Sequence, residues 1–170
     1  GKSALGSNTT ASDNTAIGGG AMEDNTTGTN NTAVGRTALA DNTTGGSNTA
    51  VGRDALKVNT TASNNTAVGY NTLLLNTSGT HNVAIGSLAL DAATTANPNV
   101  AVGYSALGAN TTATSNTAVG HQALKATTTG GENVAIGYEC LQSSTTAARN
   151  IAIGIQALND VTTSNDNVAI

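Results

Sequence analysis

The chain has 170 residues, of which only 9% are charged and 2% are aromatic. Its formal net charge of −4 leaves no basic surface, so the composition gives no support to nucleic-acid binding. No apolar run approaches the roughly 20 residues of a membrane-spanning helix, and the single cysteine, Cys140, excludes an intrachain disulfide framework.

One asparagine recurs every seventeen residues, from Asn14 to Asn167, without insertion or deletion. With Gly1 as the first position, residues 1–170 form a single repeat domain of ten 17-residue repeats. This regular spacing of aliphatic residues argues against disorder, despite the biased composition. Neither end carries an atypical polar capping repeat, so we expect the chain to be a segment of a longer array.

Some repeat positions hardly vary and others vary freely. Gly always fills position 1, Thr position 9, Asn position 14 and Ala position 16, while position 5 is Leu except at Met22 and position 17 is Val or Ile. All sixteen charged residues, and every histidine and tyrosine, fall at positions 2, 3, 6, 7 or 13. Because charged groups are rarely buried without a partner, these five positions are predicted to face solvent.

Each repeat predicts the same elements in the same order. Gly at position 1 predicts a positive φ or a close approach that a Cβ would block. A second extended stretch is expected at positions 4–5 or 9–10, with turns at position 8 and at positions 11 and 12. Positions 14–17, as in residues 48–51, predict a short strand with positions 15 and 17 on one face and position 16 on the other. We expect Leu and the Val or Ile of position 17 to form the core, with a contribution from position 15.

Short strands and turns stacked at a constant register predict an all-β fold, a parallel β-solenoid or β-roll of ten 17-residue coils spaced about 4.8 Å apart. Identical side chains then form ladders along the axis. The predicted ladders include Asn31, Asn48 and Asn65, Thr43 and Thr60, Leu39 and Leu56, and Gly35 and Gly52. Because this core is thin, we expect a second copy to cover the small Ala and Gly positions, which predicts a homo-oligomer.

The phrase N-[TV]-A-[VI]-G-x-x-A-L resembles the head repeats of YadA-like trimeric autotransporter adhesins. It is more similar to the NTAVGYxAL arrays of phage tail-fibre proteins, through Gly69-Tyr70 with Leu73, residues 103–107, and Gly137-Tyr138 with Leu141. The autotransporter repeat is shorter than seventeen residues. The resemblance implies a homotrimeric fibre or adhesin shaft, located outside the cell, at the cell surface or on a virion.

The residue types that carry catalysis or bind metals do not form a recognisable motif. Asp24 and Asp41 share position 7 in adjacent repeats, about 5 Å apart in a solenoid. A glycosidase pair needs a substrate groove between its carboxylates, so solvated surface charges are the favoured interpretation. His81, His121 and Cys140 lack metal-ligand spacing. We therefore expect no catalytic residue, no cofactor and no metal site.

Position 2 supplies the candidate contact stripe. Tyr70, Tyr104 and Tyr138 lie at this position in alternate repeats, and Arg36 and Arg53 share it. Exposed tyrosines bind sugar faces or anchor interfaces, so a cell-surface glycan is a candidate partner. The alternative is a set of isolated exposed tyrosines.

Three functions remain after these exclusions. The favoured one is a structural shaft that sets length and stiffness and displays its variable positions for attachment. The alternative is an ice-binding β-solenoid that uses threonine ladders. Against it, two threonine ranks on one face need Thr-x-Thr, whereas the invariant threonines at positions 9 and 10 are adjacent. An enzyme ranks third, because it would need a further domain.

Overall fold

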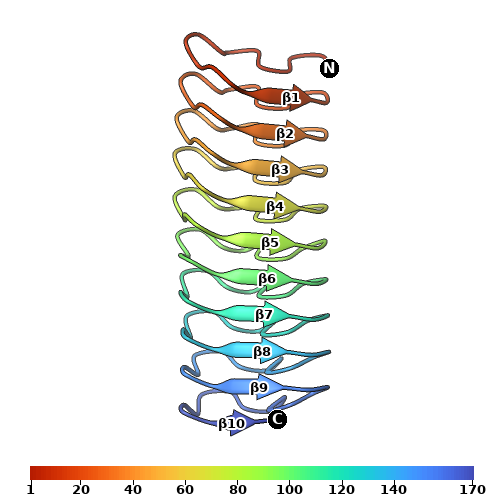
Figure 1. The fold of residues 1–170 in the computed structure, drawn as a ribbon, viewed down its shortest axis with the longest axis vertical. Helices are drawn as coiled ribbons and strands as arrows, with labels where there is room; N and C mark the ends of the chain where they lie inside the picture. The colour runs from red at the N-terminus through yellow and green to blue at the C-terminus, as the bar shows by residue number, and fades with distance from the viewer.

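The computed structural model describes residues 1–170 and contains one sheet of ten parallel strands, paired in chain order, without helices. The strands stack along a single axis, with N- and C-termini at opposite ends (Figure 1). Their bounds are β1 Thr15–Ile17, β2 Thr32–Val34, β3 Thr49–Val51, β4 Thr66–Val68, β5 Val83–Ile85, β6 Val100–Val102, β7 Thr117–Val119, β8 Val134–Ile136, β9 Ile151–Ile153 and β10 Val168–Ala169.

The register of the sheet confirms the predicted solenoid. Each strand residue pairs with the residue seventeen positions later, as Thr49 does with Thr66. The leucines of position 5 lie in one buried cluster, which includes Leu39, Leu56 and Leu73. Equivalent residues therefore stack coil upon coil.

Each coil has one strand, so the second extended stretch expected at positions 4–5 or 9–10 does not form a strand. At positions 3 and 5 the backbone is left-handed. Leu39 has φ 52° and Leu56 has φ 50°, and Asp54 at position 3 has φ 58°. A leucine in this region costs roughly 1–2 kcal/mol, while complete burial of its side chain contributes about 1.5–3 kcal/mol. Burial therefore outweighs the strain, and the chain turns here instead of extending.

The interior is built from positions 4, 5, 8, 11, 14 and 16. In the coil of residues 35–51 the buried side chains are Ala38, Leu39, Ala40, Asn42, Asn48 and Ala50. The prediction that positions 15 and 17 join the core is wrong. Positions 15 and 17 do point away from position 16, as expected, but they face outward and the alanine of position 16 faces inward. Leucine and two asparagines fill the narrow cross-section, so only a methyl group fits beneath the strand.

Glycine at position 1 meets both of its predicted requirements. Gly35 and Gly52 have φ +141° and +136°, a region that side chains rarely adopt. A Cβ on Gly35 would lie 2.4 Å from the carbonyl oxygen of Gly52 in the next coil. This position therefore lets successive coils approach closely.

The asparagines of position 14 form the predicted ladder, and they bind the backbone as well as one another. The amide nitrogen of Asn48 donates to Oδ1 of Asn31 at 2.9 Å, and its side-chain amide donates to the carbonyl of Ala62 at 2.9 Å. The same pattern recurs at Asn65, whose backbone N–H donates to Asn48. Each side chain thus satisfies two backbone groups that stacking would otherwise bury without partners.

The threonines of position 9 also form a ladder, through the backbone. Oγ1 of Thr43 donates to the carbonyl of Thr60 at 3.0 Å, and Oγ1 of Thr60 donates to the carbonyl of Thr77 at 3.3 Å. These hydroxyl groups therefore donate their protons to the next coil, and not to an external ligand.

Position 8 forms a second asparagine ladder inside the solenoid. Nδ2 of Asn42 donates to Oδ1 of Asn25 at 2.7 Å, and Nδ2 of Asn59 donates to Oδ1 of Asn42 at 2.8 Å. Asn42 also donates to the carbonyl of Gly45 three residues on, which is the expected turn contact. Asn25, Asn42, Asn59, Asn76 and Asn110 are fully buried, so the N-T-[TS] sequences that they begin are closed to glycosylation in the folded chain, whereas Asn8 in the first coil is exposed. Sequence reasoning treated this position as a turn and missed the ladder.

This ladder is interrupted at Ala93, which leaves the buried Oδ1 of Asn76 without a hydrogen-bond partner. We predict that Ala93→Asn stabilises the fold by about 1 kcal/mol, because the new amide donates to Asn76. Urea unfolding followed by circular dichroism measures the change. The control is Ala92→Asn, at an adjacent half-buried position outside the ladder, which is expected to be neutral. Equal stability of the parent and Ala93→Asn would contradict the ladder's energetic role.

Candidate functional site: the exposed columns

Side chains that vary between repeats form columns on the outside of the solenoid. None of the charged residues is buried, as predicted from their restriction to five repeat positions. His, Cys, Asp and Glu residues do not gather in any group of three suited to a metal ion. No helix of a length and hydropathy suited to crossing a membrane is found. Cys140 is buried, and its Sγ lies 3.1 Å from the carbonyl oxygen of Ala152.

The structure brings the predicted contact stripe at position 2 into one column of interacting side chains. The ring of His121 stacks between Tyr104 and Tyr138, with centroid distances of 5.3 and 5.1 Å. The guanidinium of Arg53 lies over the ring of Tyr70, 5.6 Å from its centroid. The three tyrosines are 46–47% exposed. They are therefore not isolated: His121 lies in the coil between Tyr104 and Tyr138, and Arg53 lies in the coil before Tyr70.

Stacking changes what this column offers to a ligand. A sugar packs on the face of an aromatic ring, but the inner faces of Tyr104 and Tyr138 are covered by His121. Such stacked pairs contribute about 0.5–1.5 kcal/mol each beyond area burial. The triplet therefore presents mainly ring edges and hydroxyl groups. The pKa of Glu139, beside Tyr138, is lowered by hydrogen bonds from Gln156 and then Tyr138.

A second exposed surface consists of the β-branched residues at positions 15 and 17, which we call the β-branched face. It runs the length of the sheet and carries Thr, Val and Ile without any charged residue. Ile85, Ile136 and Ile153 are 38–41% exposed. The structure thus has an uncharged sheet face without a covering layer, where the sequence predicted a core.

A third surface, the hydroxyl face, consists of positions 10 and 12. Thr112 and Thr114 are both exposed, and Ala113 between them is buried. Thr27 and Thr29 flank buried Gly28 in the same way, although Thr29 is only half-buried. Position 10 therefore forms a complete outward hydroxyl rank, and position 12 forms a second, incomplete one. Sequence reasoning missed them because it compared positions 9, 10 and 15; the small residue that always fills position 11 was the available signal.

The acidic pair at position 7 lies outside the single surface pocket, which is lined by other residues. Burial raises the pKa of Asp41, the charge of Asp24 raises it further, and the ammonium of Lys57 opposes both. Burial likewise raises the pKa of Asp91. Without a groove between them, Asp24 and Asp41 make a surface charge pair.

Comparison of the chain with protein families, with curated proteins and with solved structures finds no match. The exposed columns are therefore the features of this chain that bear on its function.

The raised pKa of Asp41 predicts a pH-dependent cost to stability. A carboxyl with a higher pKa in the folded chain holds its proton more tightly there than in the unfolded chain. Stability is consequently lost as the pH rises from the ordinary value of 3.8 through the folded value. We predict that Asp41→Asn raises the Tm at pH 7 and that this gain disappears near pH 3.

Thermal unfolding at both pH values measures the gain. Asp160→Asn serves as the control, because it removes the same charge at the same repeat position from an exposed side chain. A lower Tm for Asp41→Asn at pH 7 would show that the carboxylate is stabilising instead.

Proposed function

We propose that the chain is a structural shaft of a fibre or adhesin, built from three laterally associated copies outside the cell, at a cell surface or on a virion. The resemblance of its repeats to YadA-like heads and tail-fibre arrays supports this proposal. So does the constant register of the coils, since a stack with one rise per repeat sets length directly from repeat number. The variable positions then display side chains for attachment to a receptor.

The observation that carries the proposal is the β-branched face. Soluble monomers rarely expose contiguous apolar surfaces of more than a few hundred Å², whereas this face continues through every strand from β1 to β10. It is uncharged, and parallel packing of identical flat faces buries valine and isoleucine side chains at each coil. The self-association surface is therefore this face, and not the Ala and Gly positions expected from the sequence: the alanines of positions 4 and 16 are buried in the interior, and the glycines of position 1 lie against the backbone of the next coil.

We predict that the protein has a molar mass of about three times the 16.6 kDa chain in multi-angle light scattering. Val68→Lys with Val119→Lys places charges on the β-branched face in the fourth and seventh coils, and is expected to give a monomer with an intact β-sheet spectrum. Thr61→Lys with Thr112→Lys makes the same charge change in the same coils on the hydroxyl face, and should leave the mass unchanged. A monomeric parent chain at all concentrations would refute the lateral association.

A second candidate function is ice binding, which the hydroxyl face favours. Positions 10 and 12 face outward with a buried residue between them, so Thr112 and Thr114 provide the Thr-x-Thr spacing that the invariant pair at positions 9 and 10 does not. Hydroxyl and methyl groups repeated at about 4.8 Å along the axis present a regular surface to water. The second rank is interrupted by the residues of position 12 that lack a hydroxyl, Gly46, Asn97, Gly131, Ala148 and Asn165, which is why the shaft is preferred.

For this candidate we predict inhibition of ice recrystallisation by the parent chain, lost in Thr61→Lys with Thr112→Lys and retained in Val68→Lys with Val119→Lys. The variant that tests association is thus the control for ice binding, and the variant that tests ice binding is the control for association. An inactive parent chain, or equal loss in both variants, would count against ice binding.

A further inference from the structure

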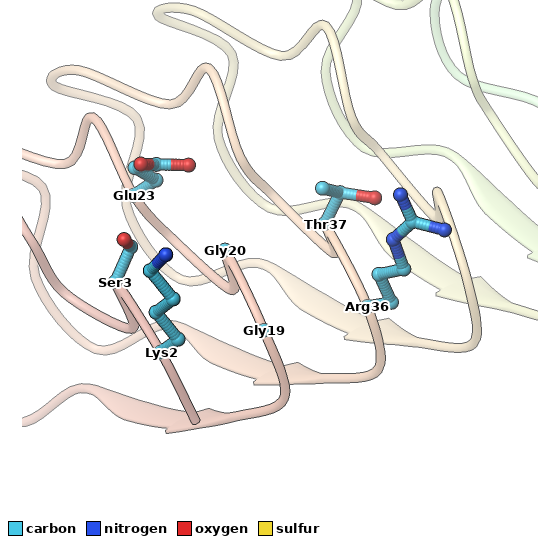
Figure 2. Close-up of a pocket in the computed structure, with 7 residues that line it drawn as sticks. All are labelled: Lys2, Ser3, Gly19, Gly20, Glu23, Arg36 and Thr37. Atoms are coloured by element: carbon cyan, nitrogen blue, oxygen red, sulfur yellow. The ribbon is translucent and has the colours of Figure 1, made fainter.

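The surface holds one pocket, a hollow of about 400 Å³ at the N-terminal end of the position 2 column. It exists because the second coil has Gly19 and Gly20 where other coils carry side chains. Figure 2 shows Lys2 and Ser3 on one side of this glycine segment and Arg36 and Thr37 on the other, with Glu23 near Lys2 and Ser3. We call this hollow the glycine notch; its lining is Lys2, Ser3, Gly19, Gly20, Glu23, Arg36 and Thr37.

Two cations, Lys2 and Arg36, line the notch together with one carboxylate, Glu23. The ion pairs of the protein, within 4.0 Å, join Arg53 to Asp54 and Arg149 to Asp166. Neither Lys2 nor Arg36 is held in an ion pair, and two cations with one carboxylate leave the lining with a net positive charge. Both side chains are exposed, and they belong to coils two apart, a separation of roughly 9.6 Å. In a chain with a net charge of −4, this is a local positive site.

The same column shows what fits between coils two apart. In the seventh to ninth coils, the ring of His121 fills the middle place between Tyr104 and Tyr138. In the first three coils the middle place is empty and the outer groups are the cations Lys2 and Arg36. The notch therefore suits an anionic ligand about one ring thick.

The remaining polar groups restrict the ligand further. Oε2 of Glu23 lies 3.2 Å from the point where a Cβ on Gly20 would be, so a hydrogen-bond acceptor lies against the notch. The hydroxyl of Ser3 makes no hydrogen bond within the protein, whereas that of Thr37 donates to Asp54. A carboxylate acceptor disfavours multiply charged anions and favours a ligand with its own hydroxyl donors.

We propose that the glycine notch binds a sugar acid. Its carboxylate lies between Lys2 and Arg36, and its neighbouring hydroxyls donate to Glu23 and accept from Ser3. The idea that this sugar acid belongs to a receptor rests on the proposed attachment role of the shaft. Binding of the sugar acid to the notch requires only the stacked coils of one chain.

The test is a titration with sodium glucuronate, followed by NMR chemical shifts of the protein labelled with ¹⁵N-glycine, which reports on Gly19 and Gly20 directly. We expect saturable shifts at these two glycines, with a dissociation constant at least tenfold lower than for glucose, acetate or inorganic phosphate. Equal affinity for acetate or phosphate would show simple ion attraction and would overturn the proposal. So would the absence of a saturable shift.

Two variants test the geometry and the charge separately. Gly19→Tyr fills the notch with a residue that this column already holds elsewhere; a Cβ at Gly19 meets no atom within 4 Å, so the fold is expected to tolerate it. Lys2→Gln with Arg36→Gln removes the two cations. Each is expected to weaken glucuronate binding at least tenfold, whereas Lys125→Gln with Arg149→Gln, an equal charge change in the eighth and ninth coils, should leave it unchanged.

Unchanged affinity in Gly19→Tyr or in the Lys2 and Arg36 variant would overturn the proposal, since thermal unfolding reports independently on their folding. The readout is separate from molar mass. A monomer that binds glucuronate would refute the shaft and keep the notch, and a trimer that does not bind would do the reverse.

Discussion

The structure depends on hydrogen bonding between each coil and the coil seventeen residues away. Of 110 backbone–backbone hydrogen bonds, only 18 lie within the strands, and the other 92 lie in turns and loops. Many of these connect neighbouring coils as the strand bonds do: the amide of Leu39 donates to Ala55, and that of Thr43 to Thr60. Stacking is therefore a property of the whole coil. A side chain that pushes one coil along the axis breaks hydrogen bonds to both neighbouring coils. Position 1 admits only glycine because a Cβ there would collide with the backbone of the next coil.

This constraint also explains a polar interior. A coil of seventeen residues encloses too little volume for a conventional apolar core, and its tight turns direct backbone N–H and C=O groups inward. Buried polar groups of this kind cost free energy unless they are paired. The asparagine side chains meet the need because an amide both donates and accepts, so that Asn48 bonds to the coil on either side of it. Leucine supplies the apolar contact, and alanine supplies the clearance.

The sequence was sufficient for the period, the parallel register, the asparagine ladder of position 14 and the exposure of the charged residues, because stacking copies each residue's environment to its neighbours seventeen residues away. It did not reveal the second asparagine ladder at position 8. It was not sufficient for the direction of the strand faces. Alternation shows that Ala50 and Val51 point opposite ways but not which of them is inside, and hydropathy favours the wrong one. Only the cross-section, filled by Leu56 and Asn59 of the next coil and their equivalents, decides it. The left-handed leucines were equally hidden, since their strain is offset by a burial visible only in three dimensions.

The same geometry determines where function resides. In an ordinary fold a site brings together residues from distant segments, but here each exposed side chain has its nearest column neighbours at fixed distances of one repeat. Arg53 meets Tyr70, and His121 meets Tyr104 and Tyr138, through that spacing alone. A missing side chain is then as informative as a present one. Gly18 keeps two backbones in contact, whereas Gly19, the next residue, removes one member from a column and opens a space. Short sequence motifs cannot reveal such sites, because the residues that form a site come from the same position in successive repeats and are seventeen residues apart in the sequence.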